Sequence, residues 1–336
     1  MHAPRFWSDP PGRPGAAARL LMPLAWIWAA VTRRRLNRPP EARLRVPVVC
    51  IGNVTAGGAG KTPVAIALAQ RLAARGIAVH IVSRGHGGSL AGPIRVDPAR
   101  HAAAEVGDEP LLLAAFAPVW IARDRAAAGR AAEAAGAALV LMDDGLQNPD
   151  LAKDLSIVVV DAGFGFGNGR VIPAGPLREP VAAGLARARL LLAIGEPAER
   201  AAFRAAWPGL GLPVAEGRLA PLATGMDWTG LRALAFAGIG RPEKFYATLA
   251  RLGAEIVATR SFADHEPFEP RLLARLEADA AARGAQLVTT EKDAVRLPAS
   301  FRPKVLVLPV RLELDDWAPV DDALGRLLPA RLLATS

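Results

Sequence analysis

Short apolar runs alternate with amphipathic stretches along most of the chain, which is 336 residues long. The run at 46–51 is rich in β-branched residues and leads into a glycine-rich turn, as is typical of a buried strand. The next stretch places Val64, Leu68 and Leu72 on one face of a helix. Further strands are predicted at 77–83, 119–122, 138–142, 156–161 and 190–194, with alanine-rich helical segments between most of them. Strands that alternate with helices predict a mostly parallel α/β sheet.

The alternation breaks into prolines, glycines and short pieces at 210–228 and then resumes. The second series predicts strands at 233–237, 255–259, 286–290 and 305–309, and helices at 242–252 and 267–283. Because a domain boundary falls where regular elements are interrupted, we expect three parts. These are a basic N-terminal arm at 1–45, a larger α/β domain at 46–210 and a smaller α/β domain at 211–336.

The N-terminal arm contains an unbroken apolar run at 20–31 that ends in Arg33, Arg34 and Arg35. Twelve residues rise about 18 Å as a helix, which is too short for a membrane span of about 20 residues. A signal peptide would carry its positive charges before the apolar run and a small-residue cleavage site after it. Here the charges follow the run, so secretion is disfavoured.

Two interpretations of this helix stay open on the sequence alone. Trp26 and Trp28 beside the arginines suit a helix that lies in a membrane interface. The apolar residues also cover nearly every face, which suits a helix packed into the protein core. We predict the interfacial helix.

The amino-acid composition of the chain excludes several classes of protein and of site. With 51% apolar and 22% charged residues, the chain is globular rather than disordered. Its one cysteine, Cys50, excludes an intrachain disulfide and a cysteine-based zinc site. The net charge is +9, but residues 1–45 hold nine arginines against Asp9 and Glu41. The rest of the chain is therefore nearly neutral, which counts against a nucleic-acid binder.

A glycine-rich segment between the first strand and the first helix predicts a phosphate-binding loop. Glycines let backbone N–H groups turn toward phosphate oxygens, and the helix N-terminus adds its dipole. Lys61 would supply a charge to the outer phosphates, and the Thr62 hydroxyl would ligate Mg²⁺. The strict pattern has glycine where Thr55 stands, so this is a variant loop. The residues predicted to bind the nucleotide are Thr55, Ala56, Gly57, Gly58, Ala59, Gly60, Lys61 and Thr62.

Asp143 and Asp144 end a predicted buried strand, with Gln147 just behind them. In nucleotide-binding folds a carboxylate at such a position holds Mg²⁺, because hard cations prefer oxygen ligands. The predicted metal ligands are therefore Thr62, Asp143, Asp144 and Gln147. Together with the glycine-rich loop, they predict a P-loop NTPase-type sheet.

Three further segments carry chemistry. Asp108 stands at a predicted helix start, where a helix N-cap is an equally good interpretation. A long glycine- and proline-rich loop at 163–180 contains the pair Arg178 and Glu179, and such loops are often functional. His265 lies in a loop of the second half. The segment 290–293 is similar to a guanine-reading motif, but its lysine stands one place late, which disfavours a GTPase.

The whole set of motifs resembles the tetraacyldisaccharide 4′-kinases of lipid A biosynthesis. The matching segments run in family order through most of the chain: GNVTAGGAGKTP at 52–63, SRGHGG at 83–88, GDEP at 107–110, DDGLQ at 143–147, GFGNGRVIPAGPLREP at 165–180, AFAGIGRPEKF at 235–245, FADHEPF at 262–268 and TEKDAVRL at 290–297. Serine or threonine is also usual in the family where Thr55 stands. The chain departs from the family at His86, at 148–149 and at Glu266.

The resemblance implies transfer of the ATP γ-phosphoryl group to the 4′-hydroxyl of a diglucosamine lipid phosphate, with ATP and Mg²⁺ as cofactors. It implies Lys61 and Asp108 as catalytic residues, with His265 as the partner of Asp108. Implied substrate contacts are Asn53, Arg84, Arg178 and Glu179. It also implies a two-domain P-loop fold and a peripheral location at the cytoplasmic face of the bacterial inner membrane, with no nucleic acid and no obligate protein partner.

Two other functions remain as alternatives. One is a P-loop ATPase at the membrane surface that regulates a partner protein and releases phosphate without a lipid acceptor. The other is a nucleic-acid binder that uses the basic arm, which the lack of interleaved aromatic residues disfavours.

Overall fold

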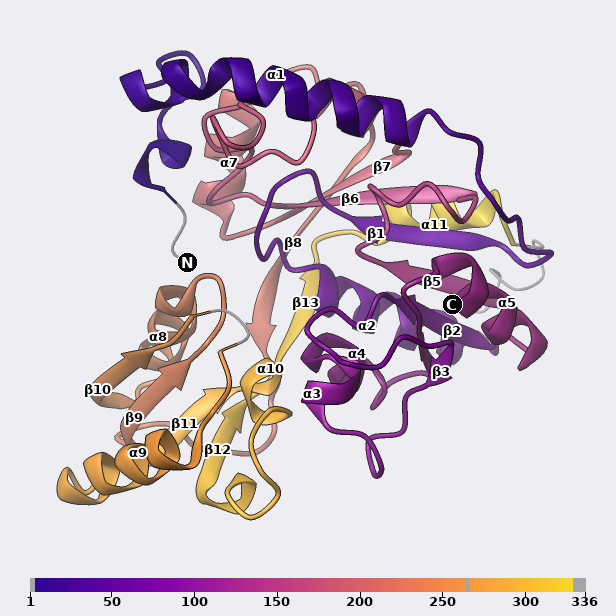
Figure 1. Ribbon diagram of the computed structural model, residues 1–336. Helices are drawn as coiled ribbons and strands as arrows, with labels where there is room; N and C mark the ends of the chain where they lie inside the picture. Colours follow the sequence, from indigo (N-terminus) through magenta and orange to yellow (C-terminus); the bar gives the residue numbers. More distant parts are fainter. Residues whose placement is uncertain (1–3, 264–265, 329–336) are drawn as a thin grey trace.

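The computed structural model describes residues 4–263 and 266–328 and contains two sheets (Figure 1). The larger sheet has nine strands in the order β13-β8-β7-β6-β1-β5-β2-β4-β3. The smaller sheet has four strands in the order β10-β9-β11-β12. The α/β fold with a large, mostly parallel sheet is therefore confirmed.

The strands of the large sheet are β1 (Val48–Gly52), β2 (Val79–Ser83), β3 (Ile94–Arg95), β4 (Val119–Ile121), β5 (Leu139–Asp143), β6 (Leu155–Asp161), β7 (Leu190–Ile194), β8 (Val214–Pro221) and β13 (Val310–Leu314). Those of the small sheet are β9 (Arg232–Ala237), β10 (Glu255–Ser261), β11 (Gln286–Thr290) and β12 (Val305–Leu308). The helices are α1 (Ala16–Leu36), α2 (Lys61–Ala74), α3 (Ala103–Val106), α4 (Asp108–Leu113), α5 (Arg125–Ala134), α6 (Val181–Leu185), α7 (Pro197–Ala206), α8 (Pro242–Arg251), α9 (Pro270–Ala282), α10 (Glu291–Ala294) and α11 (Ala318–Gly325), with short 3₁₀ turns at Arg5–Ser8 and Arg302–Lys304.

Helices cover both faces of the large sheet, so its central strands are buried on both sides. β1 shows the alternation: Val49 and Ile51 join the core beneath α2, α4 and α11, whereas Val48 and Cys50 join the core beneath α1, α5, α6 and α7. Parallel strands buried on both faces are continuous apolar runs, which is why the sequence identified them. The small sheet repeats this plan with α8 on one face and α9 on the other.

The connection between the two sheets differs from the predicted boundary at 210. β8 pairs in parallel with β7, and β13 returns from the small sheet to pair antiparallel with β8. α11 then packs Val320 and Leu324 into the core of the large sheet. The predicted C-terminal domain at 211–336 is therefore wrong in its bounds, because its first and last strands belong to the large sheet. We propose that the smaller unit comprises residues 232–308.

Helix α1 lies along one edge of the molecule, over the large sheet (Figure 1). Ala18, Ala25 and Thr32 face the protein and are buried. Six large apolar residues of the helix face outward and are between 47% and 81% exposed: Leu20, Leu24, Trp26, Ile27, Trp28 and Val31. None of the helices in the described part of the chain is long and apolar enough to cross a membrane. The core-helix interpretation therefore holds only for one side of the helix, where Leu21 and Met22 also pack against the core.

Candidate active site

The glycine-rich loop connects β1 to α2, as the sequence predicts. Gly57 and Gly60 adopt positive φ angles of 110° and 86°, a conformation that side chains disfavour. Asn53 braces the loop from inside, since its Nδ2 donates to the Thr55 hydroxyl and to the Gly57 carbonyl, both at 3.2 Å. On its outer side the Ala56 N–H donates to the Pro176 carbonyl at 2.7 Å. The loop is thus fixed by Asn53 from inside and by the segment at Pro176 from outside.

Lys61, the first residue of α2, is buried within this loop. Its Nζ lies 3.4 Å from Asn53 Oδ1 and 3.6 Å from Asp144 Oδ1. Thr62 follows it in the first turn of α2. The lysine charge is therefore held where phosphates would bind, beside a carboxylate that a bound phosphate could replace as its partner.

The two carboxylates at the end of β5 have different environments. Asp143 is fully buried, and its Oδ1 has no hydrogen-bond partner among the described residues. Burial raises the pKa of Asp143 to about 7, and the charges of Glu109 and Asp144 add to the rise. Burial would also raise the pKa of Asp144, but Lys61 and Arg178 outweigh it and lower that pKa to about 2. One carboxylate is therefore paired with cations, and the other has an oxygen available for a ligand.

Arg178 connects Asp144 to the long loop that follows β6. Its Nη1 donates to Asp144 Oδ1 at 2.8 Å and to Gln147 Oε1 at 3.2 Å. Gln147 in turn donates to the Asn53 carbonyl and to Glu179 Oε1, both at 2.9 Å. Six of the predicted site residues thus form one hydrogen-bonded network: Asn53, Lys61, Asp144, Gln147, Arg178 and Glu179.

Asp108 is buried at the start of α4. The N-cap residue of the helix is Gly107, and the Asp108 side chain accepts the N–H of the adjacent Glu109 at 2.9 Å. The N-cap interpretation of Asp108 is therefore wrong. Its Oδ2 lies 4.0 Å from Lys292 Nζ and 4.0 Å from Arg296 Nε, both beyond the small sheet's strand β11. His265, the predicted partner, lies outside the described residues.

The remaining predicted substrate residue, Arg84, is exposed and forms no hydrogen bond or ion pair with the described part of the chain. The segment 290–293 has a structural role. Thr290 Oγ1 accepts the Asp293 N–H and caps α10, and the buried Asp293 accepts the Gly238 N–H at 3.1 Å. Thr290, Glu291 and Lys292 also line the cavity described next.

A cavity of about 480 Å³ opens between the glycine-rich loop and the small sheet. On one side it is lined by Gly58 to Thr62, and on the other by residues of α8 and of the loop before it. Lys244 joins the two sides, since its Nζ lies 3.0 Å from Asp161 and 3.3 Å from Glu199. Arg241 pairs with Asp161 in the same way. A ligand held by the loop would therefore lie against both parts of the chain.

Comparison with known proteins identifies the family. The family model of tetraacyldisaccharide-1-P 4′-kinase matches residues 17–329. The chain belongs to this family. It is 63% identical to the tetraacyldisaccharide 4′-kinase of Dinoroseobacter shibae over 98% of both chains, and 56% identical to that of Jannaschia sp. over 98% of this chain and 99% of the relative.

A crystal structure of LpxK from Aquifex aeolicus in complex with ATP shares the fold. Its TM-score is 0.75 over 93% of this chain and 99% of that chain, at 24% identity. The family resemblance seen in the sequence is thus confirmed, and the chain is a kinase.

Four cations of the site have no role that the sequence predicts. Lys292 and Arg296 approach Asp108, and Arg241 and Lys244 line the cavity. All four lie in the family motifs at 235–245 and 290–297. The motifs marked the right segments, but only the folded chain shows what their charged residues face.

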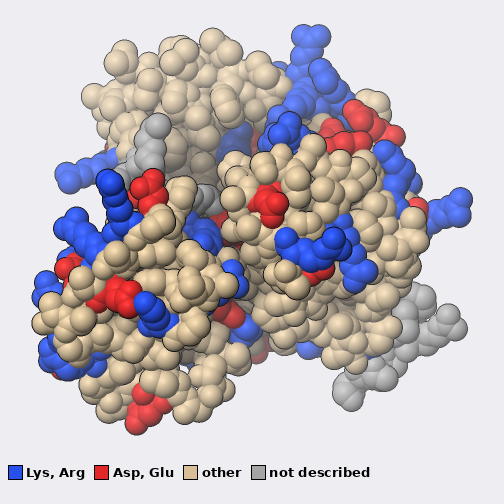
Figure 2. Space-filling model, turned by 60° about the horizontal axis from the view of Figure 1, so that its bottom comes forward, with Lys and Arg blue, Asp and Glu red and all other residues tan. Residues whose placement is uncertain are grey.

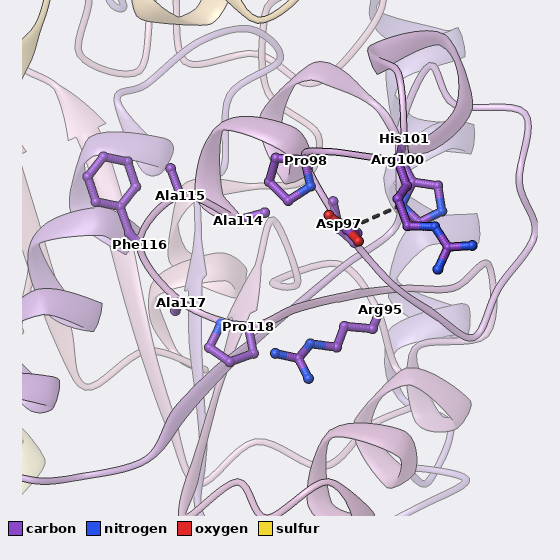
Figure 3. A pocket seen from close by; sticks show the side chains of 11 residues that line it. Arg95, Asp97, Pro98, Arg100, His101, Ala114, Ala115, Phe116, Ala117 and Pro118 are labelled. Carbon is purple, nitrogen blue, oxygen red and sulfur yellow. Dashed lines mark hydrogen bonds between the residues drawn. The ribbon is translucent and has the colours of Figure 1, made fainter.

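A second cavity, of about 950 Å³, lies apart from this site around β3 and the end of α4 (Figure 3). His101 accepts the Asp97 N–H there at 3.0 Å, and Arg95 and Arg100 also line the wall. None of the site residues predicted from the sequence lines it.

Proposed function

We propose that the chain transfers the γ-phosphoryl group of ATP to the 4′-hydroxyl of a tetraacyldisaccharide 1-phosphate. The observation that carries this proposal is the convergence of Lys61, Asp144 and Arg178 at the glycine-rich loop. The names of the family and of its relatives supply the acceptor, and the ATP complex of the Aquifex aeolicus protein supports the donor.

The nucleotide would bind with its phosphates in the glycine-rich loop. Backbone N–H groups of residues 57–62 and the N-terminus of α2 provide the donors that phosphate oxygens need. When the nucleotide binds, the Lys61 ammonium would pair with the outer phosphates instead of with Asp144. The carboxylate and the phosphates compete for the same positive charge. The rest of the nucleotide would occupy the cavity of about 480 Å³ that the loop shares with α8.

The residues at the end of β5 fit a magnesium ion. Within the described ranges, no three His, Cys, Asp or Glu side chains form a metal cage. Mg²⁺ needs none, since it binds through one or two carboxylates together with substrate phosphates and water. The buried Oδ1 of Asp143 supplies one such ligand, and Asp144 and Thr62 would complete the protein's share, with Gln147 supporting Asp144 through Arg178. When bound, the ion would neutralise charge on the transferring phosphoryl group.

Asp108 would accept the proton of the 4′-hydroxyl. As the bond between the hydroxyl oxygen and the γ-phosphorus forms, the bond from that phosphorus to the bridging oxygen breaks and ADP leaves. A loose transition state needs the hydroxyl positioned more than deprotonated, so a carboxylate is an adequate base. His265 is proposed as the partner that orients Asp108. Arg178, Glu179, Asn53 and Arg84 are proposed to contact the acceptor.

The exposed face of α1 suits a membrane surface. Its outward Leu, Ile and Trp side chains, followed by three arginines, combine apolar area with charge that attracts anionic lipid. We therefore propose a peripheral location at the cytoplasmic face of the bacterial inner membrane, where ATP is present. On the face shown in Figure 2, basic and acidic side chains are interspersed, which does not favour nucleic acid as a partner.

One experiment separates the kinase from the regulatory ATPase. The purified chain is incubated with ATP, Mg²⁺ and tetraacyldisaccharide 1-phosphate in detergent micelles, and the lipid is analysed by mass spectrometry. We expect a phosphorylated lipid in a one-to-one ratio with ADP. ADP and free phosphate formed equally well without the lipid would contradict the proposal and support the ATPase.

A further inference from the structure

Helix α1 meets the body of the protein along a narrow stripe. Its buried residues Ala18, Ala25 and Thr32 recur every seven residues, which is close to two helical turns. Trp28 and Arg35 have the same spacing and lie beside this stripe. These two side chains are therefore at the border between the outward face of the helix and the protein beneath it.

Both side chains donate a hydrogen bond to the backbone of the proposed site. The indole Nε1 of Trp28 donates to the Arg178 carbonyl at 3.1 Å. The Arg35 Nη2 donates to the Gln147 carbonyl at 3.2 Å. Arg178 and Gln147 are the two residues whose side chains meet beside Asp144. Helix α1 thus holds the network at two points, each far from it in sequence.

The Arg178 segment is fixed from two sides. The Arg178 N–H donates to the Val54 carbonyl at 2.8 Å, directly before the glycine-rich loop. Its carbonyl accepts from Trp28 on the opposite side. The guanidinium that reaches Asp144 is therefore carried by a backbone held between the phosphate loop and α1. A shift of α1 would be passed to this guanidinium.

We propose that Trp28 and Arg35 are positioning residues for phosphoryl transfer, and that α1 couples its seat on the membrane to the placement of Arg178. The inference rests on the proposed function. Misplacement of a reacting group by about 1 Å can cost about 100-fold in rate. Since each contact is one of several that hold the segment, we expect the loss of either to lower kcat by about tenfold or less.

The test compares variants in matched pairs in the full-length chain. Trp28→Phe keeps an aromatic ring and removes the N–H, and Trp26→Phe makes the same change on a side chain that donates no hydrogen bond to the described residues. Arg35→Gln and Arg34→Gln each remove one positive charge from the last turn of α1. Turnover is measured in mixed micelles of a non-ionic detergent and tetraacyldisaccharide 1-phosphate, so that affinity for a bilayer does not limit the rate.

We expect kcat of Trp28→Phe to be about fivefold to tenfold below that of Trp26→Phe, with equal KM for ATP and equal melting temperatures. Arg35→Gln should differ from Arg34→Gln in the same direction, and Arg35→Lys, which keeps a charged donor, should recover most of the loss. In an Arg178→Lys background, Trp28→Phe should change kcat by less than about twofold, because residues that act as a unit are not additive.

Equal kcat within both pairs would overturn the inference and leave Trp28 as a membrane anchor alone. A loss that persists in the Arg178→Lys background would overturn it as well. If Trp28→Phe lowers the melting temperature, the inference is tested by the kcat values of the exposed pair Arg35→Gln and Arg34→Gln instead. A wild-type chain that phosphorylates no lipid in this assay would overturn the proposed function, and the inference with it.

Discussion

Lys61→Met isolates the charge of the phosphate-loop lysine from its volume. Lys61 is 9% exposed, so methionine can occupy most of the same space without leaving a cavity. The change removes the ammonium that lies 3.6 Å from Asp144 and leaves Arg178 at 2.8 Å to pair with that carboxylate. The free energy of unfolding should therefore change by about 1 kcal/mol or less. Asp144 keeps Arg178 as a partner, and burial of an uncharged methionine does not carry the desolvation cost of a buried ammonium.

The same change should greatly reduce turnover. A preorganised donor aimed at developing charge is worth about 100-fold to 1,000-fold in kcat, or roughly 3–4 kcal/mol. Initial rates of lipid phosphorylation at saturating ATP measure this loss, and thermal melting shows whether the variant is folded. Lys61→Arg is the control for charge: its planar guanidinium is not equivalent to an ammonium at a point-charge site, so we expect only partial recovery. A folded Lys61→Met variant with near-normal kcat would refute the assignment of the loop to the nucleotide phosphates.

Three further predictions follow from the geometry. Of Asp143→Asn and Asp144→Asn, at least one should raise the Mg²⁺ concentration needed for half-maximal rate and lower kcat; wild-type dependence in both variants would remove these residues from the metal site. Leu24→Glu combined with Ile27→Glu should weaken binding to anionic vesicles by about 100-fold, since each exposed side chain contributes roughly 1.5 kcal/mol or more on burial, and sedimentation with vesicles measures it. Asp321 joins α11 to α2 through Arg71 of α2 and Arg75 just after it, and the hydrogen bond from Arg71 is the main cause that lowers the pKa of Asp321. Asp321→Asn should cost about 1–2 kcal/mol in urea unfolding at pH 7, and the difference from wild type should shrink as the pH falls below about 4, where the wild-type carboxylate begins to be protonated.

The centre of the large sheet could be predicted from the sequence because burial on both faces leaves a simple pattern. β7 (Leu190–Ile194) and β11 (Gln286–Thr290) have the predicted bounds, and most other strands agree within a few residues. The glycine-rich loop and Asp143 with Asp144 were also recognisable, since each depends on residue types at fixed spacing directly after a strand.

The edge of the same sheet could not be predicted. Residues of β8 alternate between buried and exposed, and the strand contains Gly217 and ends at Pro221, so it resembles a loop. Its partner β13 lies about ninety residues further on, where Arg218 pairs with Glu313 across the two strands. Such long-range pairing leaves no local signal. The domain boundary was misplaced for this reason.

Contacts within the site were beyond the sequence for a similar reason. The pairing of Arg178 with Asp144 requires the loop at 163–180 to return beside the glycine-rich loop, and it does so through the backbone contact of Ala56 with Pro176. The sequence marked Arg178 as notable but could not name its partner. The same holds for Lys244, whose partners Asp161 and Glu199 lie on the other side of the cavity.

The hydropathy of helix α1 cannot distinguish a core helix from an interfacial helix. Its apolar residues surround the helix, so a scale of hydrophobicity gives the core and the interfacial interpretation equal support. The structure divides them: Ala18 and Ala25 are buried and Leu21 and Met22 are partly buried against the core, whereas Leu24 and Ile27 are left exposed. A helix that packed for stability alone would bury its largest apolar side chains, because the free energy gained grows with the apolar area removed from water. The many exposed apolar side chains of α1 therefore support the proposed membrane surface, while its inward border supplies the two donors that reach the site.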